Sequence, residues 1–296
     1  MAARHGTCGH GIGETRHYEL LYSEDALRLE DLQYESKTLY KLQAIKRRLL
    51  IEAHQLGLDE EINYLDLEPQ HELNFLLQTY SKIKDRVLIS PSSILNQSAN
   101  IIFEAAQGVL IDEWVGFHPY TTWSTVTTKH AKEMCDILKI PEDEIKVLGV
   151  IRTTTTRHGN GPFPTYSERL TKELIDPNNP TNKWQGNFRV GHFDLPLFNY
   201  ACNAIKNEYK LDGIAVNHLD QGIPSVCTNY NISTDKIVYY GHSLSRQELI
   251  GKLLNTATPC LQDMDEDEFI QEIEKQAPVV IKGRGPTFLD RIGNVF

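Results

Sequence analysis

The chain has 296 residues, of which 40% are hydrophobic and 24% charged, a composition typical of folded globular proteins and unlike that of disordered or fibrous ones. Its 40 acidic residues against 30 Lys and Arg give a formal net charge of -10. This charge disfavours non-specific binding to nucleic acids or anionic membranes, so we expect neither partner and expect any bound phosphate to lie in a local pocket.

Helical and strand-like patterns alternate along the chain. Apolar residues at helical spacing predict helices over Leu39 to Leu56, Lys129 to Leu138 and Leu195 to Tyr209. Short apolar runs predict buried strands at Val87 to Ile89, Ile101 to Phe103, Val147 to Ile151 and Gly213 to Val216. Turn residues predict a loop from Leu174 to Trp184, and an acidic amphipathic helix follows at Asp263 to Glu274. The alternation predicts an α/β fold with a mainly parallel central sheet flanked by helices, in a single domain over residues 1–296.

The cysteines are odd in number and scattered, and no CxxC pair occurs: Cys8, Cys135, Cys202, Cys227 and Cys260. This pattern predicts neither a disulfide framework nor a zinc site. No apolar run reaches the roughly 18 residues of a membrane span. We therefore expect reduced thiols in a cytoplasmic protein.

A glycine-rich turn lies near the start of the sequence, from Thr7 through Cys8 and Gly9 to Gly13. Such turns let backbone N–H groups approach a phosphate, although a plain structural loop has the same glycine content. A dinucleotide-binding fingerprint follows a strand, and only six residues precede Thr7 in this sequence. The spacing therefore disfavours an oxidoreductase.

Two further stretches carry hydrogen-bond donors. The apolar run from Ile101 ends in Gln107-Gly108, where the amide could read a base or phosphate beyond a strand end or, alternatively, be buried and satisfied by backbone. A row of hydroxyl residues from Thr121 to Thr125 follows. Arg157 and His158 then stand where a strand leaves into a Gly- and Pro-rich loop, a candidate cradle for an anion.

The segments FEAAQGVLID, GFHPYTTWST, GVIRTTTTRHGNGPFPT, WQGNFRVGHFD, VNHLD and GRGP resemble, in order and spacing, the motifs of adenylosuccinate synthetases. The resemblance covers essentially the whole chain and is closest to a divergent branch with archaeal, actinobacterial and phage-encoded members. It implies a P-loop-NTPase-like fold and GTP-dependent ligation of L-aspartate to IMP. In that chemistry GTP phosphorylates the 6-oxygen of the purine, and the aspartate amino group then displaces phosphate.

The resemblance also implies the binding residues. IMP is expected at Thr7, Cys8, Gly9, Gln107, Thr122 and Arg157, with Cys8 standing where a threonine is usual. Aspartate is expected at Gly186 and Arg189, where many relatives carry several arginines. GTP is expected at His218, Asp220, Gly283 and Gly285. The carboxylate of Asp220 suits guanine, since it can accept from the N1–H and amino groups.

The family's phosphate loop, catalytic aspartate and catalytic histidine have no counterpart in this sequence. We therefore expect no catalytic residue or metal ligand within it, with the ligands of Mg²⁺ outside the chain, as in an N-terminally truncated protein whose neighbouring strands keep unpaired edges. Two alternatives stay open: the acceptor is dGMP rather than IMP, or the chain is a non-catalytic nucleotide-binding subunit. A homodimer is implied, but its shared arginine is not identified among Arg16 or Arg28.

Overall fold

The computed structural model describes residues 8–60, 62, 69–98, 100–206 and 208–293. Contacts between residues divide the chain into two units, one formed by Met1–His10 with Asn100–Phe296 and the other by Gly11–Ala99. The single domain expected over 1–296 stays a prediction. No helix in the described ranges is both long and apolar enough to cross a membrane.

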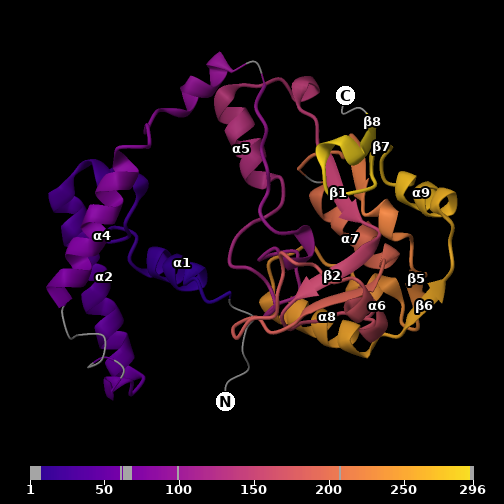
Figure 1. Ribbon diagram of the computed structural model, residues 1–296, viewed down its shortest axis with the longest axis horizontal. Helices are drawn as coiled ribbons and strands as arrows, with labels where there is room; N and C mark the ends of the chain where they lie inside the picture. Colours follow the sequence, from indigo (N-terminus) through magenta and orange to yellow (C-terminus); the bar gives the residue numbers. More distant parts are fainter. Residues whose placement is uncertain (1–7, 61, 63–68, 99, 207, 294–296) are drawn as a thin grey trace. The chain divides into compact units, whose positions relative to one another are not determined.

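The larger unit is built on a four-stranded sheet with the order β1-β4-β7-β8. Strands β1 (Leu148–Arg152), β4 (Gly213–Asn217) and β7 (Val279–Gly283) run parallel, and β8 (Arg291–Gly293) is antiparallel to β7. Figure 1 shows these strands side by side with helices around them. The α/β fold with a mainly parallel central sheet is therefore confirmed, as are the strands predicted at Val147 to Ile151 and Gly213 to Val216.

Two antiparallel ribbons accompany the sheet. Strand β2 (Thr154–His158) pairs with β3 (Phe188–His192), and β5 (Val226–Tyr230) pairs with β6 (Pro259–Gln262). Arg157 and His158 are the last two residues of β2, where the strand leaves into the predicted Gly- and Pro-rich loop from Gly159. Three consecutive threonines, Thr154 to Thr156, lead into them, and β-branched residues favour extended backbone.

The helices of this unit are α5 (Lys129–Leu138), α6 (Glu168–Glu173), α7 (Leu195–Ile205), α8 (Leu244–Thr256) and α9 (Glu266–Glu274). The predicted helices at α5, α7 and α9 are confirmed with small shifts of their ends. Helix α7 begins at the N-cap Asp194, which accepts from the Leu197 N–H, and α9 begins at Asp265 in the same way. One apolar core joins α7 and α9 to β4, and a second joins α7 to α8 and β5.

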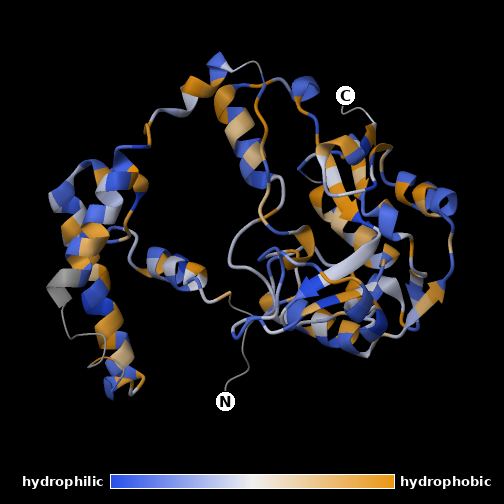
Figure 2. Cartoon of the chain, viewed as in Figure 1, coloured by the Kyte–Doolittle hydropathy of each residue, from blue (hydrophilic) through white to orange (hydrophobic). Residues whose placement is uncertain are grey.

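The smaller unit contains α1 (Ile12–Leu21), α2 (Glu35–Gln55) and α4 (Pro69–Lys84), with α2 covering the predicted helix at Leu39 to Leu56. Hydrophobic and hydrophilic residues alternate along α2 and α4 (Figure 2). The buried carboxylate of Asp31 accepts from Lys37 and Lys41 at 2.7 and 2.8 Å. Lys41 also donates to the Ala26 carbonyl at 2.8 Å, so this network fastens α2 to the segment before it.

Short 3-10 helices link the elements, at Leu29–Gln33, Ser92–Gln97, Val109–Ile111, Glu142–Glu144, Leu219–Gln221, Thr234–Ile237 and Phe288–Asp290. The segment from Leu174 to Trp184 forms neither a helix nor a strand, as predicted.

The strands predicted at Val87 to Ile89 and Ile101 to Phe103 are wrong. Neither segment pairs with a strand in the described part of the chain, and Leu88 and Ile102 are 82% and 90% exposed. An apolar run becomes a strand only where a neighbour takes its backbone hydrogen bonds. The apolar pattern was therefore read correctly, but the partner it requires is not found among the described residues.

Candidate functional site

The segment that carries Gln107 and Thr122 is organised by one buried carboxylate. Asp112 is 1% exposed and accepts from the backbone N–H groups of Trp114, Val115 and Val126 at 2.8, 3.0 and 2.7 Å. The N–H of Thr122 donates to the carbonyl of Ile111 at 2.8 Å. These bonds bring the two ends of the segment together although it has no regular secondary structure beyond one 3-10 turn.

This arrangement places the predicted donors Gln107 and Thr122 in contact. The Gln107 amide donates to the Thr122 hydroxyl at 3.2 Å, and that hydroxyl lies 3.2 Å from the Ser124 hydroxyl. Gln107 has a positive φ of 59° and an exposed side chain, so it is not a buried amide satisfied by backbone. The three side chains form a row of polar groups open to a ligand.

Arg157 and Arg189 lie opposite each other in the β2–β3 ribbon. Arg157 donates from Nε to the Asn160 carbonyl and from Nη2 to the Tyr120 carbonyl, both at 2.8 Å. Arg189 donates from Nη2 to the carbonyls of Gly159 and Gly161 at 2.5 and 3.2 Å. Because Tyr120 is two residues from Thr122, the arginines adjoin the polar row.

The charges of this arginine pair are uncompensated. Burial, together with the nearby Arg189 charge, lowers the pKa of Arg157 to about 10, and burial also lowers the pKa of Arg189. Neither guanidinium forms an ion pair with a carboxylate of the described residues. Like charges opposite each other on paired strands are destabilising, and burial adds to the penalty. An anion between the two guanidinium groups would relieve it.

A tight turn presents Trp184 beside this ribbon. The backbone groups of Asn182 and Gly186 exchange hydrogen bonds at 3.1 and 2.8 Å, and the Asn182 side-chain oxygen accepts from the N–H groups of Trp184 and Gln185. Gly186 has a positive φ of 79°, which suits glycine in such a turn. His158 Nε2 lies 3.3 Å from the Gly186 carbonyl oxygen, which ties the turn to the end of β2.

The predicted phosphate turn reaches the same place. A Cβ atom on Gly9 would overlap the indole ring of Trp184, so the ring packs directly on the Gly9 backbone. Cys8 is half-buried, whereas Thr7 lies outside the described residues. The structure therefore brings Cys8 and Gly9 to the turn that contains Gly186.

The residues predicted to bind GTP form a second group at the carboxyl ends of β4 and β7. His218 has a positive φ of 65°, and Asp220 follows on a 3-10 turn. Gly283 allows Asn217 to approach closely, because a Cβ atom there would overlap the Asn217 side chain. Gly285 similarly adjoins the Asp290 carboxylate. In parallel sheets ligands bind at this edge.

The two groups are joined through Thr153, the residue between β1 and β2. Its N–H donates to the Asn217 carbonyl and its hydroxyl to the His218 carbonyl, each at 3.2 Å. Strand β2 starts at the next residue and leads to Arg157. All predicted site residues that the structure describes thus lie on neighbouring strand ends and loops of the larger unit.

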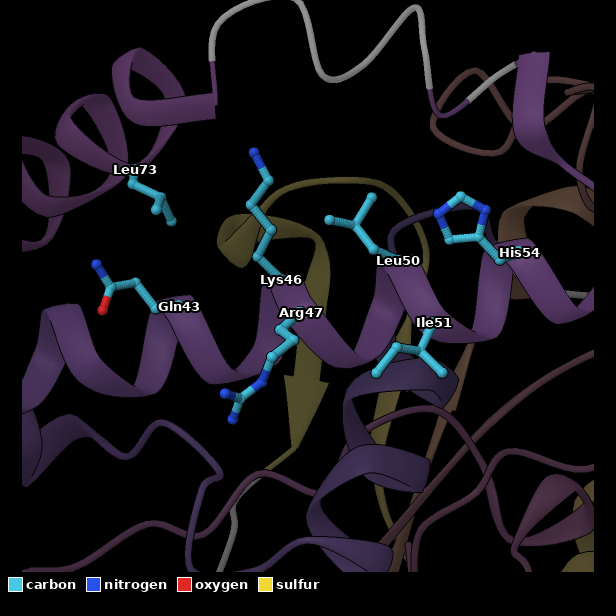
Figure 3. A pocket seen from close by; sticks show the side chains of 7 residues that line it. All are labelled: Gln43, Lys46, Arg47, Leu50, Ile51, His54 and Leu73. Atoms are coloured by element: carbon cyan, nitrogen blue, oxygen red, sulfur yellow. The ribbon is translucent and has the colours of Figure 1, made fainter.

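A groove of 370 Å³ in the smaller unit is lined by α2 and Leu73 and contains none of the predicted site residues (Figure 3). Its lining residues are Gln43, Lys46, Arg47, Leu50, Ile51, His54 and Leu73. Within the described ranges, no cluster of three or more His, Cys, Asp or Glu side chains is arranged to hold a metal ion.

Sequence reasoning missed Asp112, Ser124 and Trp184. Ser124 belongs to the hydroxyl row already noted, so its signal was available. Asp112 and Trp184 have no comparable signal, because their importance depends on which backbone groups they meet.

Comparison with known proteins identifies the family of the chain. The family model for adenylosuccinate synthetase matches residues 1–282. The adenylosuccinate synthetase of Thermoplasma volcanium is 30% identical over 252 residues, which cover 81% of this chain and 54% of the relative. That of Citrifermentans bemidjiense is 28% identical over 316 residues, covering 95% and 67%. The chain thus spans about half to two thirds of the length of these relatives.

A solved structure of fully ligated adenylosuccinate synthetase from Plasmodium falciparum superposes with a TM-score of 0.73. The match covers 98% of this chain and 71% of the other at 21% identity, and it supports the fold. With the family model matched over nearly the whole sequence, the chain belongs to the adenylosuccinate synthetase family.

Proposed function

We propose that this chain binds a purine nucleoside monophosphate, L-aspartate and GTP, and serves the GTP-dependent ligation of L-aspartate to IMP. The observation that supports this most directly is the Arg157–Arg189 pair, which is partly buried beside the Gln107–Thr122 donors and has no carboxylate partner among the described residues. Phosphate and carboxylate are the groups that arginine binds best. Both are present in the proposed substrates.

In this proposal the polar side chains around Gln107 and Thr122 and the arginine pair bind different parts of the substrates. Gln107, Thr122 and the Thr7–Gly9 turn hold the phosphate and base of IMP, with Arg157 neutralising its charge. Arg189 and the Gly186 backbone hold the aspartate carboxylates. Since the two arginines are cross-strand neighbours, both anionic substrates would meet between them.

GTP is assigned to the group at the ends of β4 and β7. The Asp220 carboxylate would accept from the guanine N1–H and amino group, which adenine does not offer in the same positions. His218, Gly283 and Gly285 would form the walls around the base. The Arg284 guanidinium, which pairs with Glu266, lies near enough to Asp220 for their charges to interact.

In the proposed reaction the 6-oxygen of IMP takes the γ-phosphoryl group of GTP. The aspartate nitrogen then bonds to C6 while the C6–O bond breaks, and phosphate leaves. Mg²⁺ would accompany GTP and stabilise the transferring phosphoryl group. We propose that the ligands of Mg²⁺ lie outside the chain. We also propose a cytoplasmic homodimer.

Calorimetric titration tests the binding part of the proposal. The chain should bind IMP, and Arg157→Met should weaken this binding at least tenfold, the loss typical of a charge-assisted contact. Parallel titrations with dGMP compare the alternative acceptor. Absence of IMP and dGMP binding by the native sequence would refute the proposal.

Turnover is tested with GTP, Mg²⁺, L-aspartate and IMP, with the chain alone and with a phosphate-loop segment supplied as a separate polypeptide. The expected product is adenylosuccinate. Nucleotide binding without product in either mixture would favour a non-catalytic binding subunit.

A further inference from the structure

Trp184 is a partly exposed aromatic residue at the proposed monophosphate site. The indole of Trp184 is 46% exposed, although a side chain of this size usually buries most of its surface. It packs on the Gly9 backbone, and the contact between His158 Nε2 and the Gly186 carbonyl joins its turn to the end of β2. Both of these neighbours belong to the proposed IMP site.

The backbone that carries the ring is held by hydrogen bonds. Its turn is closed by two backbone bonds between Asn182 and Gly186, and the Asn182 side chain accepts from two successive N–H groups at 2.9 and 2.7 Å. The absence of a Cβ atom at Gly9, whose φ is 78°, lets the indole rest on the backbone. A fixed, half-exposed ring binds a planar group with little loss of side-chain entropy.

The charges around the ring favour an anionic ligand. The Lys183 ammonium lies over the indole ring, 4.9 Å from its centroid, and the exposed Lys183 side chain would have to move aside for a base to stack on that face. Arg157 and Arg189 lie at the ends of the β2–β3 ribbon. The Gln107 amide and Thr122 hydroxyl supply neutral donors. A ligand with a planar ring and a phosphate fits this combination better than an amino acid or inorganic phosphate does.

We infer that Trp184 is the residue on which the purine base of the monophosphate stacks. The inference rests on the proposed function and adds a specificity-determining residue to it. Any purine can stack on an indole, so Trp184 would favour nucleotides over phosphates that lack a base. The polar side chains Gln107, Thr122 and Ser124 would distinguish one purine from another.

The test compares native chain, Trp184→Phe and Trp184→Ala in titrations with IMP and with ribose 5-phosphate. We expect the dissociation constant for IMP to rise about tenfold or more in Trp184→Ala and less than about threefold in Trp184→Phe. Binding of ribose 5-phosphate, which lacks the base, should change less than about twofold in both variants. Circular dichroism checks that each variant is folded.

Tryptophan fluorescence gives a second readout that does not depend on the Ala variant. Stacking should make IMP quench the emission of Trp184, and Trp184→Phe should lose this part of the quenching. Both chains carry Trp123→Phe in this experiment, because Trp123 is 46% exposed and adjoins Thr122. Trp114→Phe is the matched control, because the Trp114 ring is stacked on His242 and should not report the base.

Three results would overturn the inference. Equal IMP affinity of native chain and Trp184→Ala rejects stacking and leaves the proposed function intact. Equal weakening of IMP and ribose 5-phosphate assigns Trp184 a structural role through the Gly9 contact. If the native chain binds no IMP, the proposed function fails and this inference fails with it.

Discussion

Replacing Arg157 by methionine tests whether this arginine serves IMP binding or the stability of the fold. The pKa of Arg157 is lowered from 12.5 to about 10. Each pKa unit corresponds to about 1.4 kcal/mol, so keeping this guanidinium charged in the fold costs about 3 kcal/mol. Methionine removes that cost but also the hydrogen bonds to Asn160 and Tyr120, together worth about 1–3 kcal/mol. The two changes nearly cancel, so ligand-free stability should shift by less than about 2 kcal/mol.

The assay is urea unfolding of native chain and variant, with and without IMP. At a ligand concentration of about 100 times the dissociation constant, the native chain should gain about 2.7 kcal/mol. Arg157→Met, whose binding is expected to be at least tenfold weaker, should gain about 1.4 kcal/mol or less at the same concentration. Arg169→Met is the matched control, since Arg169 is exposed on α6 and its one carboxylate partner within the described residues is Glu173 at 2.7 Å. It should lose less than about 1 kcal/mol and keep the full gain with IMP.

The opposite pattern would refute this reasoning. Arg157→Met would then lose several kcal/mol of unfolding free energy without ligand and still gain the full stabilisation with IMP. In that case the guanidinium serves only to stabilise the fold, through its hydrogen bonds to the Tyr120 and Asn160 carbonyls. The uncompensated charge would then have no connection with anion binding.

Three further predictions concern single residues. Asp31→Asn should destabilise the chain by about 3–5 kcal/mol in urea, because it leaves the Lys41 ammonium buried without its counter-charge. Burial raises the pKa of Asp31, but the hydrogen bonds from Lys37 and Lys41 lower it by more, to about 2. The stabilisation of the fold by the Asp31 carboxylate is therefore present above about pH 4 and is lost as the pH falls through 2. Burial raises the pKa of Asp194 to about 6, so native stability should fall as pH rises from about 4 through 6; Asp194→Asn should remove this slope in thermal unfolding. Gly9→Ala should shift the emission of Trp184 and cost about 1–3 kcal/mol, since it combines a strained φ with a clash.

Part of the fold follows directly from the sequence. Fully buried parallel strands are continuous apolar runs, and β4 is such a run, with Ile214 and Val216 completely buried. Helices α5 and α7 show the helical spacing of apolar residues that burial of one face requires. These elements could be predicted because the local spacing of their apolar residues determines both the type of secondary structure and the face that is buried.

The segments at Val87 to Ile89 and Ile101 to Phe103 show the same pattern without becoming strands. A strand needs a neighbour for its backbone groups, and no short window of sequence contains that neighbour. The β2–β3 ribbon presents the reverse case, since its polar residues give no apolar signal and its partners stand about 30 residues apart. Long-range pairing, rather than local pattern, decides both outcomes.

The candidate site was predictable as a list of residues and not as an arrangement. Gln107, Thr122, Arg157 and Arg189 were each identified from motifs, but the sequence assigned the two arginines to different ligands. Only the register of β2 against β3 reveals that they face each other. Trp184 begins the WQGNFRVGHFD motif but was assigned no role, because its place beside Gly9 depends on the Asn182–Gly186 turn.

The loops around the site are fixed before any ligand arrives. Asp112 holds one segment through three N–H groups, Asn182 holds another through two, and the guanidinium of Arg189 ties down the Gly159–Gly161 loop. Little ordering is therefore left for binding to accomplish. Under the proposed function, an anion between Arg157 and Arg189 would gain affinity by relieving their repulsion. Any anion would relieve that repulsion, so discrimination among anions would depend on the uncharged groups at the site and on Trp184.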